Sequence, residues 1–319
     1  MQFSAIHSEM LHWYDQHGRH DLPWRLTRDP YRIYLSEIML QQTQVSTVLE
    51  RFYYPFLERF PTLNDVAKAD EEAVLKAWEG LGYYTRARNL HATAKLTSGS
   101  LPDGAQELER LPGIGRSTAA AIACFAYEEA VPILDANVRR ILYRFFRRRQ
   151  ADTKSLWRMA ERLFDAKHPY EYNQAMMDIG STICTPKSPK CTRCPLASHC
   201  RGRHDPERYP ALKPSRPKPI RKRTILICTD GERYGLQKGS ERLLGGLYGF
   251  PQLEMEVSGE ILGHIVHHYS HFTLDATVVL SDEQLADVEL YTPAQIEALP
   301  LSGADRKAVA LLEKAIAST

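Results

Sequence analysis

One short segment past the middle of the chain holds four of its six cysteines, and no other feature of the sequence limits the fold as strongly. Cys184, Cys191, Cys194 and Cys200 follow the spacing C-x6-C-x2-C-x5-C. Since the first ten residues show no secretory leader, we expect these thiols to be reduced and to bind metal rather than to form disulfides. Four cysteine thiolates suit a zinc ion or an iron–sulfur cluster, and general chemistry leaves that choice open.

A glycine-punctuated turn at residues 111–115, Leu-Pro-Gly-Ile-Gly, begins a second constrained stretch. Ser117–Tyr127 is rich in alanine and predicts a buried helix, and Asp135 follows it. We expect positive φ at Gly113 and Gly115, so that peptide N–H groups face outward at a helix N-terminus, where a DNA phosphate can bind. The turn alone is equally consistent with a helix–helix connection that binds nothing.

The composition is that of an ordinary globular protein. The 319 residues, 43% hydrophobic and 25% charged, are long for one domain and comfortable for two. The net charge of +2 does not indicate a nucleic-acid ligand, so such a surface must come from local clustering. No apolar run is long enough to span a membrane. Between residues 136 and 151 there is no acidic residue, and phosphate contacts are predicted there at Arg139, Arg140, Arg144, Arg147, Arg148 and Arg149.

A glutamate lies within one expected helix. Asp29 and Pro30 predict the start of this helix, which runs to about Gln41. Ile33, Leu35, Ile38 and Met39 are expected to face a core, and Glu37 lies within the same helix. On an amphipathic helix such a glutamate is more often a solvated charge than a catalytic group.

Aromatic and basic residues alternate further along. Residues 80–82, Gly-Leu-Gly, end one helix, and residues 83–88, Tyr-Tyr-Thr-Arg-Ala-Arg, begin the next. Rings interleaved with arginines suit a nucleic-acid surface, although two core tyrosines beside solvated arginines give the same pattern.

The composition changes after about residue 205. Residues 206–222 are rich in proline and basic residues, which predicts a semi-rigid linker between domains at 1–205 and 223–319. In the second domain we expect a hairpin of Thr224–Cys228 with Tyr234–Leu236. A closing helix is expected over residues 304–317, with an inward side of Ala308, Leu311, Leu312, Ala315 and Ile316.

Three of these motifs resemble one family. Residues 111–116 followed by Asp135 resemble the hairpin and catalytic aspartate of the helix-hairpin-helix DNA glycosylase superfamily. The cysteine spacing is similar to the [4Fe–4S] loop of its endonuclease III and MutY branches. Residues 36–45, Ser-Glu-Ile-Met-Leu-Gln-Gln-Thr-Gln-Val, are similar to the first catalytic motif of MutY-type adenine DNA glycosylases. The resemblance implies a multidomain fold, with an all-α helix-hairpin-helix glycosylase domain that carries a [4Fe–4S] loop and an α+β Nudix-like C-terminal domain.

The resemblance also implies roles for individual residues. Glu37 is the general acid, and Asp135 stabilises the cationic sugar. Gln42 wedges into the base stack, Tyr83 stacks beside the lesion base, and Trp24 helps to wall the adenine pocket. Further DNA contacts are implied at Gly113, Gly115, Ser117 and Asn137.

The C-terminal part resembles the same branch with departures. Tyr269-Ser270-His271 matches a Phe-Ser-His pattern that in the family reads the 8-oxoguanine opposite the adenine, so Ser270 and His271 are implied contacts. Tyrosine in place of phenylalanine keeps the ring and adds a hydroxyl. Ala136 stands where the adenine branch usually has glycine. The acidic helix that holds metal in Nudix hydrolases is absent from the sequence, so no pyrophosphatase activity is expected.

The implied function is a monofunctional base excision repair glycosylase that hydrolyses the N-glycosidic bond of adenine mispaired with 8-oxoguanine or guanine in duplex DNA. The nearest alternative is an endonuclease III-like glycosylase and lyase acting on oxidised pyrimidines, but such enzymes use a lysine nucleophile where this chain has Ser117. A non-catalytic iron–sulfur DNA-binding protein is a third interpretation, which the presence of both Glu37 and Asp135 disfavours. We expect a monomer without a membrane partner, cytoplasmic and of bacterial type, associated with the nucleoid through DNA.

Overall fold

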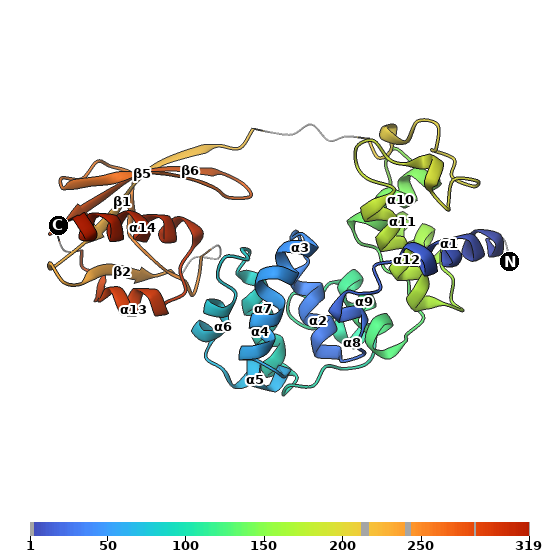
Figure 1. Ribbon diagram of the computed structural model, residues 1–319, viewed down its shortest axis with the longest axis horizontal. Helices are drawn as coiled ribbons and strands as arrows, with labels where there is room; N and C mark the ends of the chain where they lie inside the picture. The colour runs from blue at the N-terminus through green and yellow to red at the C-terminus, as the bar shows by residue number, and fades with distance from the viewer. Residues whose placement is uncertain (1–2, 212–216, 240–243, 284, 319) are drawn as a thin grey trace. The chain divides into compact units, whose positions relative to one another are not determined.

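The computed structural model describes residues 3–211, 217–239, 244–283 and 285–318 (Figure 1). The chain divides into two compact units, residues 1–41 with 100–214 and residues 42–99 with 215–319. This division differs from the predicted domain boundaries, because the helical segment 42–99 groups with the C-terminal strands. Among the described residues, no helix is both long enough and apolar enough to cross a membrane.

In the described residues of the first unit, all regular secondary structure is helical. Short 3₁₀ turns occur at Pro23–Arg25, Cys191–Arg193 and Pro206–Arg208. Its helices are α1 (Ser4–His17), α2 (Pro30–Met39), α8 (Ala105–Leu108), α9 (Arg116–Tyr127), α10 (Ala136–Phe145), α11 (Thr153–Leu163) and α12 (Pro169–Thr182).

Two apolar clusters hold these helices together. The larger joins α1, α10, α11 and α12 around fully buried side chains such as Met10, Leu142 and Met176. The smaller joins α2 to α9 through Ile33, Ala120, Ala121, Cys124, Phe125 and Ile133. The buried alanines of α9 present little side-chain bulk, which suits close packing between the two helices. This packing brings α2, with Glu37, against the helix that precedes Asp135.

The second unit combines short helices with two sheets. Its helical elements are α3 (Val45–Val48), a π-helical turn (Leu49–Tyr53), α4 (Tyr54–Arg59), α5 (Leu63–Lys68), α6 (Glu71–Ala77), α7 (Thr85–Leu96), α13 (Pro293–Ala298) and α14 (Gly303–Ser318). Its strands are β1 (Ile220–Cys228), β2 (Tyr234–Lys238), β3 (Tyr248–Gly249), β4 (Gln252–Leu253), β5 (Glu260–His268), β6 (Thr273–Ser281) and β7 (Glu289–Tyr291).

One sheet has the strand order β4-β1-β6-β5 and the other the order β3-β2-β7. In the first sheet β1 runs parallel to β6, and β5 pairs antiparallel with β6. Helix α14 packs on this sheet, and its Ala304, Ala308 and Leu312 join a core with Ile225 and Val278.

Two expectations about this domain are wrong. The predicted hairpin of β1 with β2 does not form as a ladder, because β6 and β4 take the edges of β1, and a single bridge, Thr229 to Tyr234, joins the two segments. The turn between them is present, with the Asp230 side chain accepting from the Arg233 N–H at 2.8 Å. Ile316 is 45% exposed rather than inward, because the core beneath α14 ends at Leu312.

Candidate active site

Glu37 is presented by a helix whose start is fixed locally. As expected, Asp29 caps α2, accepting the Tyr31 N–H at 2.9 Å, and Pro30 occupies the first turn. The residues predicted to face the core, Ile33, Leu35, Ile38 and Met39, are buried. Glu37 itself is half-buried, so its carboxyl is largely removed from water while it stays partly accessible.

Asp135 is both the cap of a helix and a candidate catalytic carboxylate. It is the N-cap of α10, where its carboxylate accepts the Val138 N–H at 2.7 Å and the Asn137 side-chain amide at 3.3 Å. Burial raises the pKa of Asp135, while these donors and the nearby charge of Arg140 oppose the rise. The segment before it is also fixed, since the Leu134 N–H donates to the Ser117 hydroxyl at 3.2 Å.

The two carboxyl groups influence each other. The pKa of Glu37 is raised to about 7. Burial is the largest cause, the charge of Asp135 adds to the rise, and the charge of Arg25 opposes it. The donors on Asp135 stabilise its ionised form. Burial therefore favours the protonated form of Glu37 and the hydrogen bonds favour the ionised form of Asp135, which is the division of roles that an acid and a charge-stabilising carboxylate need.

Sequence reasoning missed a buried ion pair beside this site. The Arg25 guanidinium donates to both carboxylate oxygens of Asp178 at 2.7 and 2.8 Å, and Arg19 adds its N–H and Nε at 2.9 and 2.7 Å. The Arg25 and Asp178 side chains are 3% and 1% exposed. The pair fixes the 3₁₀ turn that also carries the buried Trp24. A signal for it was an aspartate on the apolar helix segment 175–180, where an unpaired carboxylate would be costly.

The hairpin has the expected positive φ at one glycine and not at the other. Gly113 has φ of 72°, as expected. Gly115 has φ of −87° and is the extended N-cap of α9, so the expectation of positive φ there is wrong. An added Cβ at Gly115 would meet none of the described atoms within 4 Å. The local backbone therefore does not require glycine. The absence of a side chain at Gly115 instead leaves the N-terminus of α9 open to a ligand.

The remaining predicted contacts belong to the second unit and are exposed. Gln42 and Tyr83 are non-glycine residues in the left-handed region, with φ of 60° and 52°, and Tyr83 is 45% exposed. Ser270 and His271 form the tip of the turn between β5 and β6, where the Ser270 hydroxyl lies 3.0 Å from Nδ1 of His271. Glu37, Ser117, Asp135 and Asn137 thus lie in the first unit, whereas these four residues lie in the second.

The four cysteines of the predicted metal centre line one small apolar cavity. Its walls are completed by Ile183, Ala197 and Pro206, with Arg144 and Arg203 at the side. Nη1 of Arg144 donates to the Cys184 thiol at 3.2 Å. Four thiolates around an apolar space with a guanidinium beside them fit an iron–sulfur cluster, whose net negative charge such a donor stabilises.

Two arginines in the predicted phosphate-binding run serve this segment instead. Arg144 is 3% exposed and donates to the carbonyls of Cys184, Thr185, Pro186, Pro206 and Tyr209. Arg140 donates to the Cys184 and Gly180 carbonyls and to the Asn137 side chain. Placing Arg144 on a DNA-facing surface was therefore wrong, because its guanidinium is buried against the carbonyls of the cysteine segment.

Comparison with known families agrees with this architecture. Residues 35–166 match the model of the HhH-GPD superfamily of base excision DNA repair proteins, and residues 184–200 match that of the iron-sulfur binding domain of endonuclease III. The prediction of a [4Fe–4S] cluster is confirmed, and the matched segment begins and ends at two of the four predicted ligands, Cys184 and Cys200. A solved structure described as a thermostable thymine-DNA glycosylase is 30% identical, with a TM-score of 0.57 over 62% of this chain and 94% of that one.

Two curated relatives have the same description, adenine DNA glycosylase. The protein of Buchnera aphidicola subsp. Baizongia pistaciae is 42% identical over 205 residues, which are 62% of this chain and 58% of that protein. The protein of Buchnera aphidicola subsp. Schizaphis graminum is 32% identical over 299 residues, which are 85% of this chain and 86% of that protein.

The fold and the cysteine segment define a helix-hairpin-helix base excision repair protein with an iron–sulfur centre. Because the second relative is matched over most of its length, the chain belongs to the adenine DNA glycosylase family of this superfamily.

Proposed function

We propose that this protein is a monofunctional glycosylase that removes adenine mispaired with 8-oxoguanine or guanine in duplex DNA. The observation that best supports this is the pair formed by Glu37, whose pKa is about 7, and Asp135, a carboxylate held by hydrogen bonds. Family membership supports the same conclusion.

The reaction requires an acid and an anion on the two sides of one bond. Adenine in a duplex must first be extruded into a pocket. Cleavage of its N-glycosidic bond leaves the electron pair on the base and positive charge on the sugar. Protonated Glu37 donates a proton to N7 of adenine and so makes the base a better leaving group. Ionised Asp135 stabilises the cationic sugar until water attacks it.

The buried ion pair gives the pocket a fixed wall. Arg25 is locked by Asp178, so the turn with Trp24 keeps its place when a base enters. Arg25 also keeps the pKa of Glu37 from rising further, because its positive charge favours the ionised carboxylate. We propose that this turn and Glu37 together enclose the extruded adenine.

Strand cleavage is not expected. A lyase needs a lysine amine that forms a Schiff base with the sugar. Ser117 occupies that position, and its hydroxyl already accepts the Leu134 N–H. The four cysteines would hold the cluster, which supplies structural cross-links for residues 184–200.

We further propose that the exposed Gln42, Tyr83, Ser270 and His271 contact the mispair, and that Gly113, Gly115 and Asn137 contact the DNA around the extruded nucleotide. The free N-terminal end of α9 at Gly115 suits a phosphate. We propose a monomer that acts in the bacterial cytoplasm and associates with the nucleoid through duplex DNA.

The test is single-turnover release of adenine from duplexes with adenine opposite 8-oxoguanine, guanine or thymine, with and without alkali. We expect fast release opposite 8-oxoguanine and strand cleavage only after alkali. Duplexes with thymine opposite guanine or with an oxidised pyrimidine are the controls. Nicking of the latter without alkali, and no adenine release, would instead identify an endonuclease III-like lyase.

A further inference from the structure

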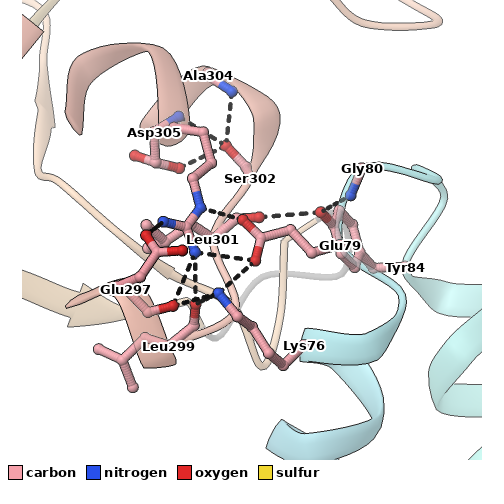
Figure 2. A network of polar contacts seen from close by, with 11 residues as sticks. Lys76, Glu79, Gly80, Tyr84, Glu297, Leu299, Leu301, Ser302, Ala304 and Asp305 are labelled. Carbon is pink, nitrogen blue, oxygen red and sulfur yellow. Dashed lines mark hydrogen bonds and ion pairs between the residues drawn. The ribbon is translucent and has the colours of Figure 1, made fainter. Parts of the chain in front are cut away.

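A dense polar network lies at the start of α14, in the second unit (Figure 2). The Ser302 hydroxyl caps the helix, accepting the N–H groups of Ala304 and Asp305 at 3.2 Å each and donating to the Asp305 carboxylate. Asp305 also accepts the Phe250 N–H at 3.0 Å. Ser302 and Asp305 are each 2% exposed, so this helix start is a rigid, buried element.

The network extends to the loop that carries Tyr83. The Tyr84 hydroxyl donates to the Leu301 carbonyl at 3.0 Å and accepts the Gly80 N–H at 3.4 Å (Figure 2). Arg306, one turn into α14, binds Glu79 through both Nε and Nη2. These contacts hold Glu79 and Tyr84, which bracket Tyr83, at the start of α14.

Several further contacts strengthen this connection. Arg306 also pairs with Glu297 at 2.5 Å. Lys76 donates to the Leu299 carbonyl at 3.1 Å and pairs with Glu79 at 2.8 Å (Figure 2). The Arg306 and Glu79 side chains are 24% and 16% exposed, so the pair is partly shielded from solvent. A bidentate arginine–carboxylate contact restricts both distance and orientation.

The same helix start contacts the base of the Ser270–His271 turn. The Tyr269 ring stacks on Phe272 at 4.6 Å and meets the His267 ring edge-on at 4.6 Å. His267 lies against Gly303, where an added Cβ would come within 2.9 Å of its ring. Burial raises the pKa of the Tyr269 hydroxyl to about 12, and the neighbouring Ser302 opposes this rise while Asp305 adds to it.

We infer that the first turn of α14 is a positioning element that couples two mispair-contacting elements, the loop with Tyr83 and the turn with Ser270 and His271. Both must engage one mispair at the same time, and a fixed spacing between them removes the conformational entropy that two independent elements would lose. Arg306 and Tyr84 are positioning residues, acting through the elements they hold. The inference rests on the proposed function, since it assumes that both elements contact the mispair.

The test is a double-substitution cycle. Tyr83→Ala and His271→Ala are made singly and together, and the ratio of adenine release rates opposite 8-oxoguanine and opposite guanine is measured. In an otherwise wild-type chain we expect the two losses to be non-additive by about tenfold. In an Arg306→Ala background the non-additivity should disappear, and Tyr84→Phe, which removes a single hydroxyl, should reduce it.

Lys238→Ala is the matched control, because Lys238 pairs with Glu72 between the same two segments but away from α14. The cycle should stay non-additive in this background. Additive losses in the wild-type chain, or equal loss of coupling in Lys238→Ala, would overturn the inference. A wild-type protein that releases no adenine from any duplex would instead overturn the proposed function, so the two failures are distinct.

Discussion

The two units place their proposed functional residues in opposite environments. In the first, Glu37 and Asp135 are half-buried and their pKa values are raised by burial. In the second, Gln42, Tyr83 and the β5–β6 turn are exposed, and the first two have left-handed backbones. A carboxylic acid must be removed from water to keep its proton near neutral pH, whereas a residue that contacts a bound partner must be exposed. Strained backbones persist at such positions because the surrounding structure holds them.

The largest expected effect distinguishes the catalytic step from recognition of the mispair. Glu37→Gln keeps the size of the side chain and removes the proton donor, so adenine release should fall by about 10²–10⁴-fold while affinity for the mispaired duplex is retained. Single-turnover release and fluorescence anisotropy measure the two quantities. Equal loss of rate and affinity would contradict the assignment of Glu37 as the acid.

Glu37 should also make the rate of adenine release and the stability of the fold depend on pH. Because Glu37 must be protonated and its pKa is about 7, the single-turnover rate should fall as the pH rises above about 7. The folded state holds this proton more tightly than the unfolded state, so the group's contribution to the free energy of unfolding is fully present below the unfolded value of 4.5 and is lost as the pH rises through about 7. Glu37→Gln should therefore raise Tm at pH 8 and not at pH 4. An unchanged Tm difference between these two pH values would contradict the raised pKa.

Asp135 tests whether one carboxylate has two roles. Asp135→Asn keeps an oxygen for the Val138 N–H and should abolish activity with little loss of stability. Asp135→Ala should also lose the cap, at about 1 kcal/mol of unfolding free energy. Urea unfolding of both variants beside adenine release gives the comparison, and equal stability of the two would show that the cap contributes nothing.

Within the arginine run, Arg144 and Arg148 should differ in stability. Arg144→Ala leaves buried carbonyls of the cysteine segment unpaired, so we expect a loss of about 3 kcal/mol and of bound iron. Arg148 is exposed, and Arg148→Ala should change stability by less than about 0.5 kcal/mol while weakening DNA binding at low salt. Iron content and thermal unfolding distinguish them, and similar iron loss in both would contradict the structural role of Arg144.

The smallest effect is expected at the departure from the family pattern. Tyr269→Phe keeps the stack on Phe272 and removes a buried hydroxyl, so stability should change by less than about 1 kcal/mol and preference for 8-oxoguanine should remain. Tyr269→Ala removes the stack and should lose that preference. A large effect of Tyr269→Phe would show that the hydroxyl itself orders the turn.

Features decided by near neighbours were predictable from the sequence. The Asp29 cap of α2, the alanine-rich helix before Asp135 and the spacing of the four cysteines depend on residues a few positions apart, so their identity was enough. The resemblance of these motifs to one family was then sufficient to name the fold and the cofactor.

Partners distant in sequence were decided only by the tertiary structure. Arg25 meets Asp178 and Arg144 meets the carbonyl of Pro206 because packed helices bring them together, and nothing in the local sequence shows which polar group will need which partner. The raised pKa of Glu37 has the same origin. A carboxyl gains its proton affinity from what surrounds it, and those surroundings exist only in the folded protein.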